Sequence, residues 1–312
     1  MHRLYRGLRP DRPAYPAGRA DRAAAKRVMR TARHFFAAAI ALLCGLMLAG
    51  GAAGAAEKPL IFGVFPKLTA RQTVTVYLPL AKSMEKQLGR PVAIYSARDF
   101  ETFVERTRRG EYDILLTAPH LAWLAREDAG YAPLLKYAEP TRGLLVVARA
   151  SAYRHPEDMR GRTIATADPL AVTVLAAEAE LAARGIERQI DYQTRGAGTH
   201  FNAVMQVVNG RADAAMLGLH PYLLLPPEVR ARLRILADTE PLSSLMYLTH
   251  PRLPARDVEA VRRGILAFAA TAEGARFLRR GGYGSFVPAD DSELPALQPY
   301  ALQAREMLRA SR

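Results

Sequence analysis

Cysteine is nearly missing from this sequence. The 312 residues contain one, Cys44, which lies in an apolar stretch close to the N-terminus. The residues before it, Ala-Leu-Leu, fit a lipoprotein cleavage site poorly, because such a site has a small residue directly before the cysteine. Once that stretch is removed as a signal sequence, no thiol remains. Disulfide bonds, thiol catalysis and cysteine-ligated metals are then excluded for the mature protein.

Long hydrophobic runs are also scarce. The run Phe35–Leu48 has about fourteen residues, against roughly twenty for a helix that spans a membrane. Arginines precede it and small residues follow it, which is typical of a secretory signal. We therefore predict a signal peptide over residues 29–56, cleaved after Ala55 or Ala56. Residues 1–28 are interpreted as upstream sequence from a start codon assigned too early.

Strong charge of one sign is confined to this N-terminal part. The whole chain has 44 Lys and Arg against 30 Asp and Glu, a net charge of +14. Residues 1–56 hold ten of the basic and two of the acidic residues, so 34 and 28 remain and the net charge falls to +6. That balance predicts no nucleic-acid partner and is compatible with an anionic ligand.

Motifs for catalysis and for cofactors are missing as well. The sequence has no G-x-S-x-G elbow, no Walker loop, no H-E-x-x-H and no G-x-G-x-x-G after a strand. No nucleophile, base and orienting group occur together in a recognisable spacing. We expect a protein that holds a molecule rather than transforms it: not an enzyme, with no catalytic residues and no cofactor.

What the remaining residues, about 256 of them, do contain is an alternation of short apolar strands and helices. This alternation is typical of βαβ units around a largely parallel sheet. The first series has strands at Leu60–Phe65, "PVAIYS" and "YDILLT", and helices at Val74–Leu88, Asp99–Arg109 and Leu121–Ala129. Ligands collect at the carboxyl ends of such strands, so the loops of interest are Pro66–Thr73, Ser96–Phe100 and Thr117–His120.

A second series of the same kind follows the strand "RGLLVVARA". It has strands at "GRTIAT", "QIDYQTR" and "ADAAMLG", helices from Val172 and from His200, two strands within "RLRILADTEPLSSLMYLTHP", and then helices at Ala255–Ala272, Ala275–Arg280 and Glu293–Arg309. We predict two α/β lobes that face one cleft. Lobe 1 comprises residues 57–143 and 240–312, and lobe 2 comprises residues 144–239. Hinge crossings are expected near Arg142–Leu145 and Asp238–Pro241.

Three of the five histidines after residue 56 fall at or just after the end of a predicted strand: His120, His200 and His220. A histidine there serves as a neutral hydrogen-bonding group, as a cation toward an anion, or as a metal ligand. A simple loop or capping role is the alternative for each. Their convergence on a divalent metal or metal chelate, with Zn, Ni or Cu as the suitable ions, is a second hypothesis.

Two helix starts are candidate anion sites. In "GRTIATADPLAV" the strand leads into a helix through Asp168-Pro169, and the amides after the proline are available to an anion. The hydroxyls nearby belong to Thr166 and Thr173. In "RGAGTHFNAV" the glycines allow close backbone approach and Thr199 is suited to cap the helix that begins at His200. Capping alone is the other interpretation of this loop.

The chain from Lys58 to about Tyr300 resembles the PhnD-like family of periplasmic substrate-binding proteins, which serve ABC importers of phosphonate, phosphite and phosphate. "LIFGVFP" and "YLPLAKSMEKQLGRPVAIYSARDFETFVERTRRGEYDILLTAPHLAWLARE" are similar to the family's first lobe, and "HPEDMRGRTIATADP" and "GAGTHFNAVMQVVNGRADAAML" to its second. The resemblance implies a type II periplasmic binding protein. It also implies a monomer that closes on a small anionic solute and docks on an ABC permease in the inner membrane.

The resemblance also implies a set of ligand-binding residues. Family members usually have Ser-Thr-Ser after Asp-Pro, whereas here Thr173 supplies the one hydroxyl in that region. His200 matches the family's histidine before its second-lobe helix, and Phe100 matches an aromatic residue without its hydroxyl. A histidine at position 220, where aminophosphonate binders tend to have an acid, disfavours an aminoalkyl ligand. The expected site comprises Phe100, Thr117, His120, Thr173, Thr199, His200 and His220. A sensory module for a membrane kinase remains an alternative to import.

Overall fold

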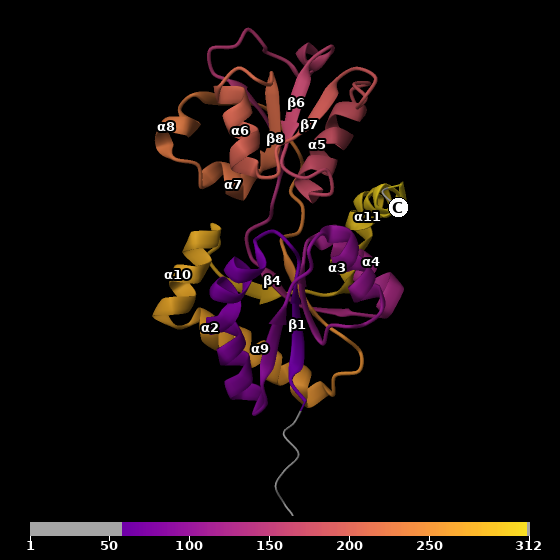
Figure 1. Cartoon of the computed structure of the whole chain (residues 1–312), viewed down its shortest axis with the longest axis vertical. Helices are drawn as coiled ribbons and strands as arrows, with labels where there is room; N and C mark the ends of the chain where they lie inside the picture. The colour runs from indigo at the N-terminus through magenta and orange to yellow at the C-terminus, as the bar shows by residue number, and fades with distance from the viewer. Residues whose placement is uncertain (1–57, 311–312) are drawn as a thin grey trace, which may run out of the picture. The chain divides into compact units, whose positions relative to one another are not determined.

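A computed structural model describes residues 58–310, which form two α/β lobes, each built on a sheet of its own (Figure 1). The sheet of lobe 1 has six strands in the order β11-β4-β10-β3-β1-β2. Their bounds are β1 Leu60–Val64, β2 Val92–Tyr95, β3 Ile114–Thr117, β4 Ala132–Tyr137, β10 Met246–Thr249 and β11 Phe286–Pro288. The sheet of lobe 2 has five strands in the order β7-β6-β8-β5-β9. Their bounds are β5 Gly143–Ala148, β6 Thr163–Thr166, β7 Gln193–Gly196, β8 Ala214–Gly218 and β9 Leu233–Asp238.

Helices connect these strands and cover the sheets. Lobe 1 has α2 Ala70–Leu88, α3 Phe100–Arg108, α4 Pro119–Ala129, α9 Ala255–Ala269, α10 Ala272–Gly281 and α11 Gln298–Ala310. Lobe 2 has α5 Val172–Ala182, α6 His200–Val208, α7 Leu219–Leu223 and α8 Pro227–Arg230. Short 3-10 turns occur at Pro156–Met159, Asp291–Glu293 and Pro295–Leu297. In lobe 1, α2 packs against α9, and α3 packs against α4 on the other side of the sheet (Figure 1).

Both sheets are mixed, so the prediction of a largely parallel sheet is wrong in part. The first three strands of lobe 1 are parallel, as the βαβ pattern predicts. Strand β10, however, enters between β3 and β4 and is antiparallel to both. In lobe 2, β5 is likewise antiparallel to β8 and to β9. The reason is topological: the strands with which the chain enters or re-enters a lobe, β5 and β10, run opposite to the βαβ strands β8 and β3 that they pair with.

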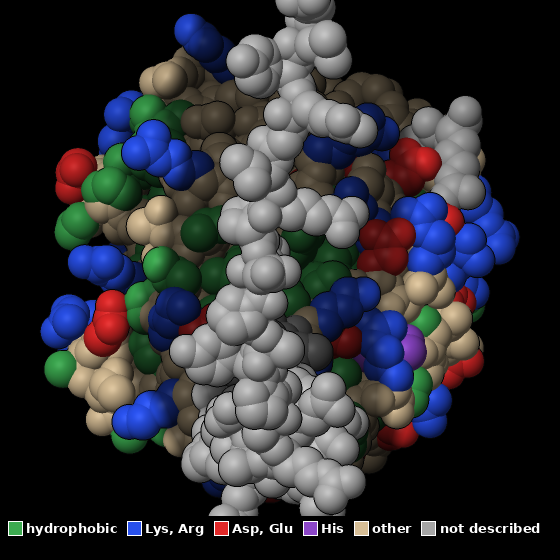
Figure 2. Space-filling model, turned by 60° about the horizontal axis from the view of Figure 1, so that its bottom comes forward, with side chains coloured by type: hydrophobic (Ala, Val, Ile, Leu, Met, Phe, Trp, Pro, Cys, Tyr) green, Lys and Arg blue, Asp and Glu red, His purple; other side chains and the backbone are tan. Residues whose placement is uncertain are grey.

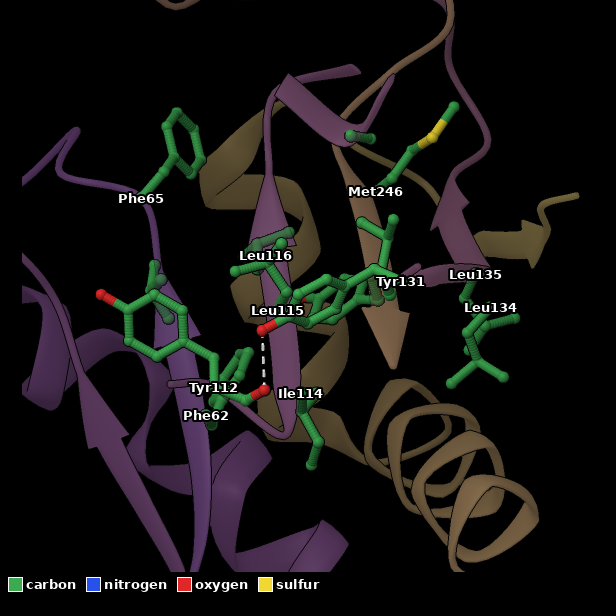
Figure 3. Close-up of a cluster of buried hydrophobic side chains, with 14 of the residues drawn as sticks. Phe62, Phe65, Tyr112, Ile114, Leu115, Leu116, Tyr131, Leu134, Leu135 and Met246 are labelled. Carbon is green, nitrogen blue, oxygen red and sulfur yellow. Dashed lines mark hydrogen bonds between the residues drawn. The ribbon is translucent and has the colours of Figure 1, made fainter. Parts of the chain in front are cut away.

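The core of lobe 1 forms around the parallel strands. The side chains of Ile114, Leu115 and Leu116 are all buried, which explains why β3 reads as an unbroken apolar run. Figure 3 shows this cluster, in which the Tyr131 hydroxyl donates a hydrogen bond of 2.7 Å to the Tyr112 carbonyl. Gly63 is needed in β1, since a Cβ there would lie 2.5 Å from the Tyr112 ring. This packing holds the carboxyl end of β3 in place.

Two chain segments connect the lobes. They follow β4 and β9, and they pair with each other through an antiparallel bridge between Thr141 and Leu242. The Thr141 N–H donates to the Leu242 carbonyl at 2.9 Å, and the Leu242 N–H donates back at 2.8 Å. Of the predicted hinge residues, Arg142 lies in a connecting segment, whereas Leu144 and Leu145 already belong to β5. The lobe boundaries predicted at 143 and 239 stay a prediction.

Local capping accounts for several shifts between predicted and observed elements. Helix α2 begins at Ala70 rather than Val74, because Thr69 and Gln72 form a capping box there. Asp99 caps α3 by accepting from the Thr102 N–H at 2.7 Å, which agrees with the predicted start. Strands β4 and β11 were not predicted. The signal peptide and the extension at residues 1–28 lie outside the described residues, and within those residues no helix is long and apolar enough to cross a membrane.

Basic side chains outnumber acidic ones in the part of the surface that Figure 2 shows. Lys and Arg side chains are spread around this face, with Asp and Glu among them. Many charged side chains of the described residues pair, as in the contacts of Arg126 with Asp291 at 3.1 Å and of Arg305 with Asp128 at 2.6 Å. This distribution agrees with the modest net charge expected after residue 56.

Candidate functional site

The three strand-end histidines lie where the sequence predicts them, each in the first turn of a helix that follows a strand. His120 is the second residue of α4, His200 the first of α6, and His220 the second of α7. The preceding strands are β3, β7 and β8. These strand ends belong to both lobes, as expected for loops that face a shared ligand.

His120 is fully buried and has unused hydrogen-bonding capacity. Its exposed fraction is 0%, and neither ring nitrogen has a hydrogen-bond partner of good geometry among the described residues. Burial lowers the pKa of His120 to about 4, and an interaction with the backbone of Leu170 opposes this effect. Thr117, at the end of β3, is also fully buried and its Oγ1 has no partner in the described part of the chain. A pair of buried, unsatisfied polar side chains calls for an explanation, because such groups cost free energy.

Leu170 belongs to the loop before α5 in lobe 2, so His120 of lobe 1 meets the start of that helix. The helix begins at Val172, as predicted, and not directly after Asp168-Pro169. Asp168 to Ala171 instead forms a turn in which Leu170 N–H donates to Asp168 Oδ1 at 2.7 Å and Ala171 N–H donates to the Asp168 carbonyl at 3.1 Å. This Asx turn at Asp168 keeps residues 168–171 out of the helix, which therefore begins at Val172.

The first turn of α5 has backbone N–H groups without an acceptor in the described chain. Ala171 occupies the cap position and offers no side-chain hydrogen bond. The amides of Val172 and Thr173 have no acceptor within residues 58–310, as expected for the first turn of a helix. Thr173 lies close to two glycines: a Cβ at Gly143 would be 2.3 Å from the Thr173 carbonyl oxygen, and one at Gly218 would be 3.5 Å from its Oγ1. These glycines let α5 approach β5 and β8 closely, which fixes the position of the open amides.

His220 packs against lobe 1. Its ring centroid lies 4.6 Å from that of Tyr283, at an interplanar angle of 40°. Burial lowers the pKa of His220, the Glu139 carboxylate opposes this, and the Lys67 ammonium adds to the lowering. Glu139 accepts from the Gly284 N–H at 2.8 Å, while its Oε2 is buried with no partner among the described residues. His220 therefore has an acidic neighbour that the sequence interpretation missed.

The loop of His200 combines capping with a free ring nitrogen. Thr199 caps α6, and its Oγ1 accepts from the Asn202 N–H at 3.1 Å. Burial lowers the pKa of His200 to about 4, and its Nδ1 has no partner within residues 58–310. Phe100 begins α3 and packs on Phe65 at 6.1 Å between ring centroids.

The contacts join some of the predicted site residues and not others. His120 meets the approach to α5, and Thr173 lies beside Gly218, two residues before His220. No hydrogen bond or ring contact joins Thr199 or His200 to these side chains within the described chain. Nor does any group of three or more His, Cys, Asp or Glu side chains in that part of the chain form a possible metal site. The three histidines are thus not gathered as the metal hypothesis requires.

A group of four tyrosines beside His220 was not predicted. The hydroxyls of Tyr137 and Tyr247 lie 3.1 Å apart, Tyr283 stacks on Tyr137 at 4.0 Å between centroids, and Tyr77 lies nearby on α2. Burial raises the pKa values of Tyr137 and Tyr247 well above their usual range, so both hydroxyls stay protonated. The sequence signal was weak, because these four positions are scattered between residues 77 and 283.

Comparison with known proteins gives consistent matches. A family model described as "ABC transporter, phosphonate, periplasmic substrate-binding protein" matches residues 62–294. Among solved structures, PhnD1 from Prochlorococcus marinus in complex with methylphosphonate has a TM-score of 0.68 at 14% identity, covering 80% of this chain and 98% of that one. The binding protein component of an ABC phosphonate transporter from Pseudomonas aeruginosa has a TM-score of 0.66 at 19% identity, covering 80% and 87%.

A third match carries a different ligand. XAC2383 from Xanthomonas citri bound to ATP has a TM-score of 0.68 at 20% identity, covering 79% of this chain and 98% of that one. At these identities the structural matches establish the fold, a type II periplasmic binding arrangement. The family model spans most of residues 58–310, so the chain matches this family in its sequence as well as in its fold.

Proposed function

Because the chain belongs to the family of periplasmic substrate-binding proteins of phosphonate ABC transporters, we propose that it binds a small oxyanion of the phosphonate, phosphite or phosphate class and delivers it to a membrane permease. The family consists of substrate-binding transport proteins, not enzymes. The observation that carries the proposal is the interaction of the buried His120 ring with the backbone of Leu170, two residues before α5, whose first amides have no acceptor within residues 58–310.

The anion is held first by lobe 2. The N–H groups of Val172 and Thr173 point out of the first turn of α5, where the helix dipole favours negative charge. The Thr173 hydroxyl adds a third donor. Each hydrogen bond to a charged oxygen contributes about 1.5–3 kcal/mol. These groups replace the Ser-Thr-Ser run that the family resemblance leads one to expect.

Lobe 1 completes the site with neutral donors. With a pKa of about 4, the His120 imidazole is uncharged near neutral pH and offers one N–H. The Thr117 hydroxyl, buried and unpartnered in the described chain, is the second group on this side. An anion between the lobes gives all of these groups partners at once, so that ligand binding favours the closed arrangement.

The experiment is a thermal-shift and calorimetry screen of the mature chain against phosphate, phosphite, methylphosphonate and sulfate. A bound anion at a hundred times its Kd stabilises the protein by about 2.7 kcal/mol. Thr173→Val keeps the shape of the side chain and removes its hydroxyl, so we expect about a tenfold or greater loss of affinity. Thr194→Val is the control, because that hydroxyl accepts from Gln189 instead. Failure of all four anions at millimolar concentration contradicts the oxyanion proposal.

The remaining expectations belong to this proposal. Members of the family act in the periplasm, and the signal peptide over residues 29–56 would bring this chain there. A monomer with an inner-membrane permease as partner is expected from the same role. The connecting segments paired at Thr141 and Leu242 would serve as the hinge.

A further inference from the structure

A cavity of about 580 Å³ lies within lobe 1, beside the tyrosine group. Its walls come from α2 and α10, and Tyr137 and Tyr283 form part of its lining. The volume falls in the range of about 300–1,000 Å³ that is usual for pockets for organic ligands. A bare phosphate or methylphosphonate is much smaller, so the cavity provides more room than the anions of the proposed function need.

The charges around this cavity do not balance. Lys67, Arg276 and Arg280 line it together with one acid, Glu273. Neither arginine forms an ion pair or a hydrogen bond with any residue in the described range, and Lys67 lies over the Phe65 ring at 5.4 Å. Arg276 and Arg280 are four residues apart on α10, a spacing at which like charges destabilise a helix. A negatively charged group in the cavity would relieve this repulsion.

The rest of the lining is apolar and aromatic. Val76 and Pro79 of α2 belong to this lining, together with Leu68, Phe268 and Phe277. Val76 keeps 39% of its surface exposed, although its neighbours are hydrophobic. A ligand with a hydrocarbon segment would cover this surface and gain free energy from the buried area.

The end of α10 connects the cavity with His220. Arg280 and Gly281 line the cavity, Gly282 ends the helix in the left-handed conformation with φ 79°, and Tyr283 follows. A Cβ at Gly281 would lie 2.7 Å from the Tyr283 ring, and one at Gly282 would lie 3.4 Å from His220 Cδ2. The two glycines therefore allow the Tyr283 ring to lie with one side toward the cavity and close to His220.

We propose that this cavity is a second anion subsite, which accepts the distal carboxylate or phosphate of an organic ligand whose phosphonate or phosphate end is held at α5. This inference rests on the proposed function and names its substrate class: phosphonates or phosphate monoesters that carry a second acidic group on a short hydrocarbon chain. Arg276 and Arg280 bind the distal anion, and Phe277 and Val76 cover the chain between the two ends.

The test is calorimetry with three ligands: methylphosphonate, phosphonoacetate and 3-phosphonopropionate. The unaltered protein is expected to bind one of the two phosphonocarboxylates about tenfold more tightly than methylphosphonate, since a charge-assisted pair is gained. Arg276→Gln with Arg280→Gln removes this advantage and leaves methylphosphonate affinity within about twofold. Arg279→Gln is the matched control, because Arg279 lies on the same helix, also lacks an ion pair in the described chain and does not line the cavity.

The outcomes separate the inference from the proposed function. Methylphosphonate binding without any gain for the longer ligands overturns the subsite and leaves the proposed function intact. If the double variant loses affinity equally for all three ligands, the subsite is also overturned, because the arginines then act only through the net charge of the protein. Absence of binding by any phosphonate overturns both. Arg280→Gln alone, with half of the charge change, provides a second measurement if the double variant folds poorly.

Discussion

At the scale of single residues, the proposed site contains buried histidines whose pKa values are shifted. His120 and His200 share a pKa of about 4, in both cases lowered by burial. The sequence predicted that these two histidines lie at strand ends, which follows from the βαβ pattern. It did not predict Glu139 as a neighbour of His220, because strand β4 was not predicted and Glu139 was therefore not seen to lie just beyond a strand end.

The shifted pKa of His120 predicts a pH dependence of stability. A free histidine titrates near 6.5, so between pH 6.5 and 4 the unfolded chain binds a proton that the folded protein does not. Stability is therefore lost as the pH falls through this window, by about 3 kcal/mol for His120 alone. The His120→Gln variant should lose less stability over the same pH range, because it has no imidazole at this position. Urea unfolding at pH 7, 5.5 and 4 measures this difference.

The control for that experiment is His155→Gln. His155 is exposed on the short turn before β6, so this variant removes a histidine from the surface and leaves the buried His120 ring in place. Parallel profiles for the His120 variant and the unaltered protein would show that the His120 ring is not the group that titrates.

At the scale of elements, helix α5 is positioned by what it packs against. Gly143 in β5 and Gly218 at the end of β8 provide the space for its backbone. The sequence predicted both the strand and the helix from Val172. Pro169 does not begin the helix, because the Asp168 carboxylate accepts from the Leu170 N–H and this local bond competes with helix formation.

A substitution at Gly143 tests the role of this close approach. In Gly143→Ala the new Cβ would lie 2.3 Å from the Thr173 carbonyl oxygen and 3.2 Å from the Ala177 amide nitrogen, so α5 has to shift. We expect a loss of about 1–3 kcal/mol in the free energy of unfolding. Oxyanion affinity should fall by about tenfold or more, because misplaced donors lose their hydrogen bonds. Chemical denaturation and calorimetry measure the two effects.

Gly196→Ala is the matched control for the Gly143 variant. Gly143 begins β5 and Gly196 ends β7, so both are terminal residues of lobe 2 strands. The φ of Gly196 is not in the left-handed region, and a Cβ there would meet nothing within 4 Å. This substitution should leave the free energy of unfolding nearly unchanged. Equal effects of the two substitutions would contradict the argument that α5 is held by contact with Gly143.

At the scale of the whole described chain, the fold class and the two-lobe plan were predictable because apolar periodicity is local. The antiparallel entry of β10 between β3 and β4 was not, because it depends on pairing between segments more than a hundred residues apart. The same limit applies to the tyrosine group and to the cavity beside it. Both are assembled from β4, α2, α10 and their neighbours, and no local pattern in the sequence connects these segments.

Closure around a ligand is a property of the two lobes together. The Thr141 and Leu242 pairing keeps the connecting segments side by side, while His120 with Leu170 and His220 with Tyr283 join the lobes near the proposed anion. Without the anion, the contact at His120 buries unsatisfied nitrogen atoms, which favours separation of the lobes. Saturating methylphosphonate should therefore decrease the radius of gyration measured by small-angle X-ray scattering. Thr173→Val combined with His120→Asn should remove this decrease at the same ligand concentration, whereas calorimetric binding to the unaltered protein without any compaction would refute closure.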